Sequence, residues 1–441
     1  MGVLPSTVIL LCNRRFFRWA ILGLTLPLVM FNSTAINFFS QESYRGTSRG
    51  MEISIIYIVA FTIVLALSIQ QGPRKLLPEW GCWIYLLYFL LSLPSLSTAE
   101  NRMFSFFELW KMVMISVVFL AVYYYLEFSR GDFDAVIYGI MGVVIFNFFT
   151  IVMQHFRGIY QVYGTFPHQN SMAMYMQLAG MLFFSRYFNQ KEGWRSLVFL
   201  VAFAMAAVAL ARTYSRGAIA CFPIAVLVVL SVSIWYKFNV RKIRIAIFLG
   251  LVGMIGVAIF IPRIIQRFKT APESSGQTRK DFAVAAINMM KHHPYIGVGI
   301  NNWGIKINPP YEYAQHREEM RYKDDYKDGI VETIYLLVGA ECGIPCLLIL
   351  LIWFGYYYLS AFRLLRRLRG SPFFYIPAGA LGGMTGIFMQ SCLEWVLKQQ
   401  INFMQLVTVF AFLSYLNRHY REFTEAAEVP HPDPVLTKEK A

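Results

Sequence analysis

The sequence has little charge and few residues suited to a metal site. Charged residues make up 15% of its 441 residues, against roughly 25% in soluble globular proteins, and this argues against a soluble enzyme. The six cysteines show no metal-binding spacing. We interpret Cys342 and Cys346, four residues apart, as part of a small-residue helix face. We therefore expect no metal site.

Three further patterns are missing. The short alternating segments of a β-barrel are absent, and so is an internal repeat of the kind that relates the two halves of many transporters. The Arg14, Arg15 and Arg18 cluster precedes a long apolar run that has no small-residue cleavage site. We therefore expect a start-transfer helix in place of a cleavable signal peptide.

Long apolar runs dominate the sequence instead. Hydrophobic residues make up 57% of the chain and the mean hydropathy is +0.49. Apolar stretches of about 20 residues recur along its length, which predicts an all-α polytopic membrane protein with about 12 transmembrane helices. The predicted spans are 17–37, 51–70, 80–98, 104–127, 134–154, 170–189, 196–212, 216–235, 244–262, 333–359, 372–391 and 400–417.

The basic residues indicate how the chain is oriented. The net charge is +15 and the sequence pI is about 9.5, but cytoplasmic loops of membrane proteins collect Lys and Arg, so we expect no nucleic-acid partner. Alternate loops are rich in these residues, which predicts that both termini are cytoplasmic. We expect residues 418–441 to be a cytoplasmic tail, disordered from about Glu422.

One loop is much longer than the others. Residues 263–332 would lie on the non-cytoplasmic side, after helices 1–9 in residues 1–262 and before helices 10–12 in residues 333–417. Loops of this length are usually functional. Within it, Thr278 is a plausible N-cap and apolar residues follow at helical spacing up to Pro294. This predicts an amphipathic helix over 278–294 at the membrane surface.

Arginines occur where the positive-inside rule disfavours them. Arg212 and Arg216 flank Thr-Tyr-Ser between two spans, on the outer side. They are either snorkelling side chains in a tight turn or a cationic site for phosphate or pyrophosphate oxygens, with Gly217 allowing close approach of a ligand. Arg279 and Lys280 begin the predicted loop helix. They are either a solvated pair or a site for an anion at the helix N-terminus.

Polar residues also stand at the outer ends of two spans. His168 is either a proton carrier or structural, and Asn170 is either an N-cap or a site residue. Glu332 either pairs with a loop arginine or acts as a base, and Tyr335 would share its helix face. Within span four, Glu108 and Lys111 form either an internal ion pair or a substrate contact.

Four segments, in this order and spacing, carry a resemblance to a known family. They are GTFPHQN (164–170), TYSRGA (213–218), TRKDFAVAAINMMKHHPYIGVGINNW (278–303) and ETIYLLVGAECGIPCLL (332–348). The region from about 160 to 350 resembles the O-antigen ligase / O-antigen polymerase superfamily. The Pro-Tyr-Ile-Gly-Val-Gly stretch is similar to that family's Pro-x-x-Gly-x-Gly after its loop helix.

The resemblance implies a GT-C-like membrane enzyme of the bacterial inner membrane, without cofactor or metal. It would move a glycan from undecaprenyl pyrophosphate, on the periplasmic face, to an acceptor sugar hydroxyl. The acceptor is lipid A core in ligases and a growing repeat-unit chain in polymerases. By position, the resemblance assigns Arg216 and Arg279 to the lipid pyrophosphate. Glu332 stands where ligases commonly have a candidate base histidine, whereas Tyr335 matches the motif.

These residues suggest a single displacement with inversion at the anomeric carbon. Arg216 and Arg279, with Arg212 in support, would stabilise the leaving pyrophosphate, and Glu332 or His168 would accept the proton. Composition alone suggests Trp303 and Tyr311 as aromatic surfaces for sugars. The competing hypothesis is a flippase or transporter for polyprenyl-linked oligosaccharides, which would place its binding residues near the middle of the membrane.

Overall fold

The structure is a computed structural model, and it describes residues 3–13, 15–25, 35–40, 44, 46–71, 79–190, 193–248, 250–251, 273–314 and 329–428. Helices dominate it. The first half contains α1 (Val3–Cys12), α2 (Phe16–Thr25), α4 (Ile55–Gln71), α5 (Trp80–Ser92), the 3-10 helix η3 (Leu93–Ser97), α6 (Arg102–Ser129), α7 (Phe133–Phe156), α8 (Gln169–Asn189), α9 (Trp194–Arg212) and α10 (Arg216–Tyr236). The second half contains α12 (Glu273–His292), α13 (Trp303–Lys306), α15 (Ile334–Cys342), α16 (Ile344–Arg367), η4 (Pro372–Phe374), α17 (Tyr375–Gln390), η5 (Val396–Lys398) and α18 (Gln400–Glu428).

Six of the described helical segments are long and apolar enough to cross a membrane. They are Trp80–Ser97, Arg102–Ser129, Phe133–Phe156, Arg216–Tyr236, Ile344–Arg367 and Pro372–Gln390. Four shorter apolar helices accompany them. The chain is therefore a multi-pass α-helical membrane protein. The predicted span 244–262 lies largely outside the described residues, and twelve spans remain a prediction.

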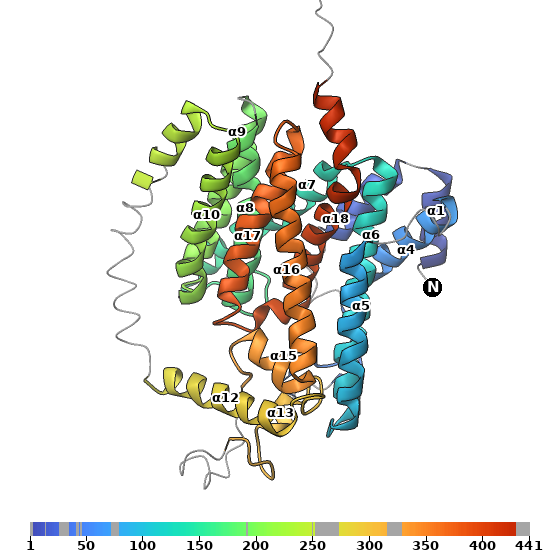
Figure 1. Cartoon of the computed structure of the whole chain (residues 1–441), viewed down its shortest axis with the longest axis vertical. Coiled ribbons are helices and arrows are strands. Elements are labelled where there is room, and N and C mark those ends of the chain that lie inside the picture. The colour runs from blue at the N-terminus through green and yellow to red at the C-terminus, as the bar shows by residue number, and fades with distance from the viewer. Residues whose placement is uncertain are drawn as a thin grey trace, which may run out of the picture.

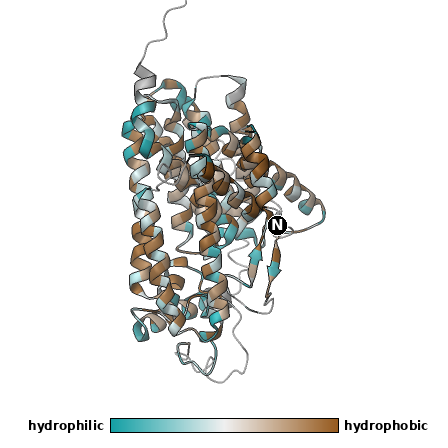
Figure 2. Cartoon of the chain, turned by 90° about the vertical axis from the view of Figure 1, so that its right-hand side faces the viewer, coloured by the Kyte–Doolittle hydropathy of each residue, from teal (hydrophilic) through white to brown (hydrophobic). Residues whose placement is uncertain are grey.

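The long helices form a bundle, and the site lies at one end of it. α8 packs against α9, α10 and α17, and α18 packs against α6. In Figure 1, α12 lies crosswise at the lower end of the bundle, while the C-terminal part of α18 stands at the upper end. Figure 2 shows hydrophobic residues predominating along the long helices and hydrophilic residues at the two ends, as expected for helices that cross a membrane.

The predicted first span, 17–37, is wrong at its end, where residues 36–38 form a strand, and the fold is not purely α-helical. Residues 26–34 of that span lie outside the described residues. α2 ends at Thr25, and β1 (Ile36–Phe38) pairs antiparallel with β2 (Met51–Ile53), with Ile36 opposite Ile53. β2 also replaces the start of the span predicted over 51–70. Ile and Phe fit the pleated surface of a strand well, so hydropathy alone does not distinguish this short ladder from a helix.

The span predicted over 333–359 is also wrong, because it is two helices. α15 ends at Cys342, and Gly343 adopts a φ of +86° before α16 begins at Ile344. This left-handed conformation favours glycine. Pro345 fits the first turn of the second helix, where no N–H is needed. The break places the end of α15 against the loop that precedes it in the chain.

The last helix continues beyond the predicted span. α18 runs to Glu428, so the disorder expected from about Glu422 is wrong as far as that residue. The extension has side-chain partners: Phe423 packs against Phe373 at 4.8 Å between ring centroids, and His419 lies 3.0 Å from a carboxylate oxygen of Glu127. Residues 429–441 lie outside the described part of the chain.

Candidate functional site

The loop helix is present, but it begins earlier than predicted. α12 starts at Glu273 and ends at His292, just before Pro294. Arg279 therefore lies in the second turn, so the prediction that Arg279 and Lys280 begin the helix is wrong. A role of the two residues in binding an anion stays a prediction.

One face of α12 is buried within the loop's own core. Phe282, Ala285, Ala286 and Met289 recur at helical spacing and pack with residues of the loop and of α15. Trp303 belongs to the same core: it is 1% exposed and its indole N–H donates to Gly329 O at 3.1 Å. The expectation that Trp303 offers a surface to sugars is therefore wrong.

The Pro-Tyr-Ile-Gly-Val-Gly stretch joins this core to the end of α15. Val298 N donates to Ala340 O at 2.9 Å and Gly299 N donates to Glu341 O at 3.0 Å. Gly297 has a φ of +69°, and a Cβ there would lie 2.3 Å from the carbonyl of Glu341. The stretch thus satisfies carbonyl groups that the end of α15 leaves without intrahelical partners. It fixes α12 relative to the broken helix, and glycine is required for this approach.

Arg279 and Glu332 form an ion pair, so the structure brings two of the predicted residues together. Their side chains are 34% and 35% exposed. Glu332 lies two residues before α15, so the prediction that it shares a helix face with Tyr335 is wrong. Burial raises the pKa of Glu332 above its ordinary value, while the positive charges of Arg279 and Arg216 oppose that effect.

The two arginines of the α9–α10 turn separate. Tyr214 adopts a left-handed φ of +51°, and the turn leaves Arg212 at the end of α9 and Arg216 at the start of α10. Arg212 bonds to His155 at the end of α7. Arg216 lies close enough to Glu332 to lower the pKa of that carboxyl. Arg216 therefore belongs to the Arg279 and Glu332 group, whereas Arg212 supports the neighbouring helix end.

Glu394, which the sequence analysis did not single out, completes the group. It lies between α17 and α18 and is 5% exposed. Burial first, and then the negative charge of Glu332, raise the pKa of Glu394 to about 7. The charges of Arg279 and Arg216 act in the opposite direction, as does a hydrogen bond from the Asn170 side chain. We call Arg216, Arg279, Glu332 and Glu394 the charge cluster.

The structure also shows the contacts of the remaining predicted residues. His168, not Asn170, is the N-cap of α8, because its Nδ1 accepts the backbone N–H of Asn170 at 3.2 Å; the N-cap reading of Asn170 is wrong. Desolvation by the surrounding protein lowers the pKa of His168. The Tyr335 hydroxyl donates to Phe388 O on α17 at 3.0 Å. Lys280 is exposed, next to the paired Arg279.

Gly217 lies beside the end of α17. A Cβ at this position would stand 3.6 Å from the side chains of Gln390 and Leu393, at and just beyond the end of α17. These are ordinary van der Waals distances, and close approach of a ligand at Gly217 stays a prediction. Its closeness to the α17–α18 linker explains how Arg216, the preceding residue, comes near Glu394.

A second set of charges lies deeper, beneath the linker. Glu108 Oε2 is 2.6 Å from Lys111 Nζ, which confirms the internal ion pair predicted for span four. Lys398 of η5 joins it, with its Nζ 3.5 Å from Glu108 and 2.8 Å from Glu341. All four side chains are at most 6% exposed. Two carboxylates and two lysines balance, and they connect α6, α15 and the linker that carries Glu394.

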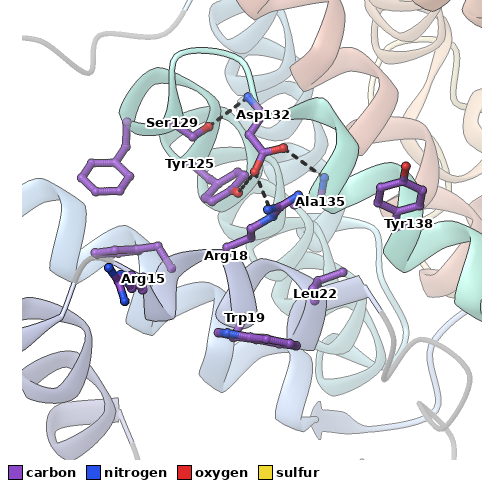
Figure 3. Close-up of a pocket in the computed structure, with 11 residues that line it drawn as sticks. Arg15, Arg18, Trp19, Leu22, Tyr125, Ser129, Asp132, Ala135 and Tyr138 are labelled. Atoms are coloured by element: carbon purple, nitrogen blue, oxygen red, sulfur yellow. Dashed lines mark hydrogen bonds and ion pairs between the residues drawn. The ribbon is translucent and has the colours of Figure 1, made fainter.

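One cavity of about 460 Å³ is remote from the charge cluster. It lies between α2, the end of α6 and the start of α7, where Arg18 pairs with Asp132 at 3.2 Å (Figure 3). The other end of α6 contacts the long loop, since Asn302 Oδ1 accepts from Asn101 N. A 28-residue helix is about 42 Å long, so this cavity is not part of the candidate site.

Comparison with known proteins agrees with these motifs. The search of curated proteins gives no match to the chain. Residues 200–351 match a family model described as O-Antigen ligase, and this range includes Arg216, Arg279 and Glu332 but not Glu394. Members of this family are membrane enzymes of the glycosyltransferase type. This match spans about a third of the chain, and it supports the resemblance to the O-antigen ligase / O-antigen polymerase superfamily.

Proposed function

We propose that this protein transfers a glycan from undecaprenyl pyrophosphate to a hydroxyl group of an acceptor sugar, at the periplasmic face of the bacterial inner membrane. The observation that supports the proposal is the charge cluster. Two arginines from different helices meet two carboxylates at one end of the bundle. Glycan transfer from a diphosphate needs this combination of fixed positive charge and a proton acceptor.

The arginines would bind the pyrophosphate. Arginine presents a planar set of donors that suits phosphate oxygens. Arg279 pairs with Glu332 in the structure, so a bound diphosphate would replace that carboxylate as its partner. Arg216 and Arg279 would then stabilise the negative charge that develops on the leaving group. Such electrostatic stabilisation is usually the largest catalytic contribution.

Glu394 is the better candidate for the base. A general base works best when its pKa is near the operating pH, and the pKa of Glu394 is raised to about 7. The acceptor O–H proton passes to a Glu394 carboxylate oxygen as the acceptor oxygen bonds to the anomeric carbon. The bond from that carbon to the pyrophosphate breaks, and its electron pair leaves with the pyrophosphate. This single displacement inverts the anomeric centre.

The orientation in the membrane follows from the basic residues. α10 begins with Arg216 and is followed by Lys237, while α16 begins beside Gly343 and ends with Arg366 and Arg367. Lys and Arg therefore gather at the ends of these helices that are opposite to the charge cluster. The positive-inside rule then favours a periplasmic charge cluster and cytoplasmic termini. A GT-C-like fold and the choice between ligase and polymerase remain predictions.

Transfer by purified variants tests the arginines. In liposomes that contain a defined undecaprenyl-pyrophosphate glycan and an acceptor, we expect Arg216→Ala and Arg279→Ala to slow transfer by about 10²–10³-fold. Lys280→Ala, the exposed neighbour, is the matched control and should keep the normal rate. Release of undecaprenyl pyrophosphate is measured with transfer. If the glycan-lipid crosses the bilayer without releasing its pyrophosphate carrier, the protein is a flippase and the proposal fails.

A further inference from the structure

A polar cavity lies beside the charge cluster. It encloses about 290 Å³, and its lining includes Arg49, Glu52, Trp110, Lys111, Trp395 and Gln399. Trp395 is the residue after Glu394. Ser171, which also lines the cavity, follows the Asn170 that bonds to Glu394. The chain neighbours of Glu394 and of its partner Asn170 therefore both line the cavity.

The wall of the cavity is held in place by buried hydrogen bonds. Asn301, in the loop motif after Gly299, has a φ of +56°, and its Oδ1 accepts from Thr47 N at 2.8 Å. Its Nδ2 donates to Ser48 O at 2.9 Å. Glu108 accepts from the hydroxyl groups of Thr47 and Ser48 at 2.7 and 2.6 Å. The cavity is thus formed before any ligand binds, as small-molecule sites usually are.

The cavity presents the groups that recognise a sugar ring. Trp110 is half-buried, and its indole N–H donates to Glu52 O at 3.0 Å, which orients the ring. Aromatic faces suit the C–H faces of pyranose rings, and a few polar groups suit the hydroxyls. Gln399 Oε1 is buried and makes no hydrogen bond to any described residue. A buried acceptor without a donor is costly, and a sugar hydroxyl would supply one.

We infer that this cavity binds one or two sugar units of the glycan next to the base. The inference rests on the proposed function, because it places the sugar beside Glu394. The volume is near the lower end of about 300–1,000 Å³ that is typical of ligand pockets, so it fits a short segment of glycan and not a lipid chain. The sugar units come from either the acceptor or the donor.

Binding measurements on the full-length protein in nanodiscs test the inference. One probe is oligosaccharide released by mild acid from the host's own surface glycan, which has no lipid. The others are undecaprenyl pyrophosphate with the host's repeat unit and undecaprenyl pyrophosphate without sugar. Trp110→Ala and Gln399→Ala are compared with the wild type, and Trp194→Ala, which changes a residue 74% exposed at the start of α9, is the control. Trp110→Phe should restore binding if the ring face is what matters.

The outcomes separate the two sources. If the sugar comes from the acceptor, both alanine variants weaken binding of the free oligosaccharide by about tenfold or more. If it comes from the donor, they weaken binding of the glycosylated lipid but not of the bare one. If both alanine variants bind all three probes as the wild type does, the inference is overturned, even if the protein does transfer glycan. Glycan binding that depends on Trp110, in a protein that transfers nothing, would support the cavity and refute the proposed function.

Discussion

Replacing Glu394 with glutamine keeps the shape of the side chain and removes its ability to ionise. Glu394 is 5% exposed, and its pKa of about 7 compares with an ordinary value of 4.5. A tenfold change in an ionisation equilibrium corresponds to about 1.4 kcal/mol. The difference of about 2.5 therefore means that the fold disfavours the Glu394 carboxylate by about 3 kcal/mol. Glutamine resembles the protonated acid, so it should avoid this cost.

The sign of the effect sets its dependence on pH. Because the pKa of Glu394 is raised in the fold, the folded state binds more protons than the unfolded state between pH 4.5 and 7. Stability of the wild type is therefore lost as pH rises through this range. Glu394→Gln should be more stable than the wild type by about 3 kcal/mol above pH 7, and the difference should fall towards zero near pH 4.5.

Thermal unfolding of the purified protein without donor measures this difference. About 1 kcal/mol shifts Tm by roughly 2–4 °C in domains of 150–250 residues, so we expect Glu394→Gln to raise Tm by several degrees at pH 8 and by little at pH 5. Glu312→Gln makes the same chemical change at an exposed position and is the control. The variant should also lose transfer activity, a stability gain at the expense of function. A Tm difference that is equal at pH 5 and pH 8 would refute the reasoning.

Three further variants test the surroundings of Glu394. Glu332→Gln removes a negative charge that raises the pKa of Glu394, and it leaves Arg279 without its carboxylate partner. In a plot of kcat/KM against pH, the rise in activity should therefore occur at lower pH than in the wild type. A rise at higher pH would contradict the assignment of Glu394 as the base. Lys398→Met leaves two buried carboxylates with one lysine and should cost about 3–5 kcal/mol of stability, seen as a lower Tm. His168→Asn keeps an N-cap acceptor, so transfer should persist; a loss of more than about tenfold at unchanged Tm would instead make this imidazole part of the chemistry.

The helices were predictable from the sequence, and the interruptions in them were not. Runs of about 20 apolar residues identify candidate spans because an unpaired backbone polar group is costly in lipid. The break in the tenth predicted span was not predicted, because hydropathy is averaged over a window that includes Gly343. The Gly-Ile-Pro sequence at this position was a signal for the break. The short strands β1 and β2 escaped because their apolar residues continue the pattern of the neighbouring helices.

The candidate site was predictable in part. Arg216 stood out because the positive-inside rule disfavours arginine on the predicted outer side. Arg279 and Glu332 stood out as charged residues at the predicted ends of the loop helix and of the next span. Glu394 carries the same signal, between two spans and next to Trp395. Its importance depends on partners such as Asn170, more than 200 residues away in the chain, and no local pattern reveals that contact. Arg212 and Arg216 look equivalent in sequence, and only the left-handed turn at Tyr214 separates them.

Two separate structures hold the two halves of the charge cluster in position. The backbone hydrogen bonds from Val298 and Gly299 join the loop core to the end of α15, and this fixes the helix that carries Arg279. On the other side, Lys398 lies four residues after Glu394 in the same linker and is tied to buried carboxylates of α6 and α15. Both structures meet at Glu341, whose carbonyl accepts from Gly299 and whose side chain accepts from Lys398. Electrostatic catalysis depends on charges that do not reorganise during the reaction, so the broken helix at Glu341 sets the distance between the proposed base and the pyrophosphate arginine.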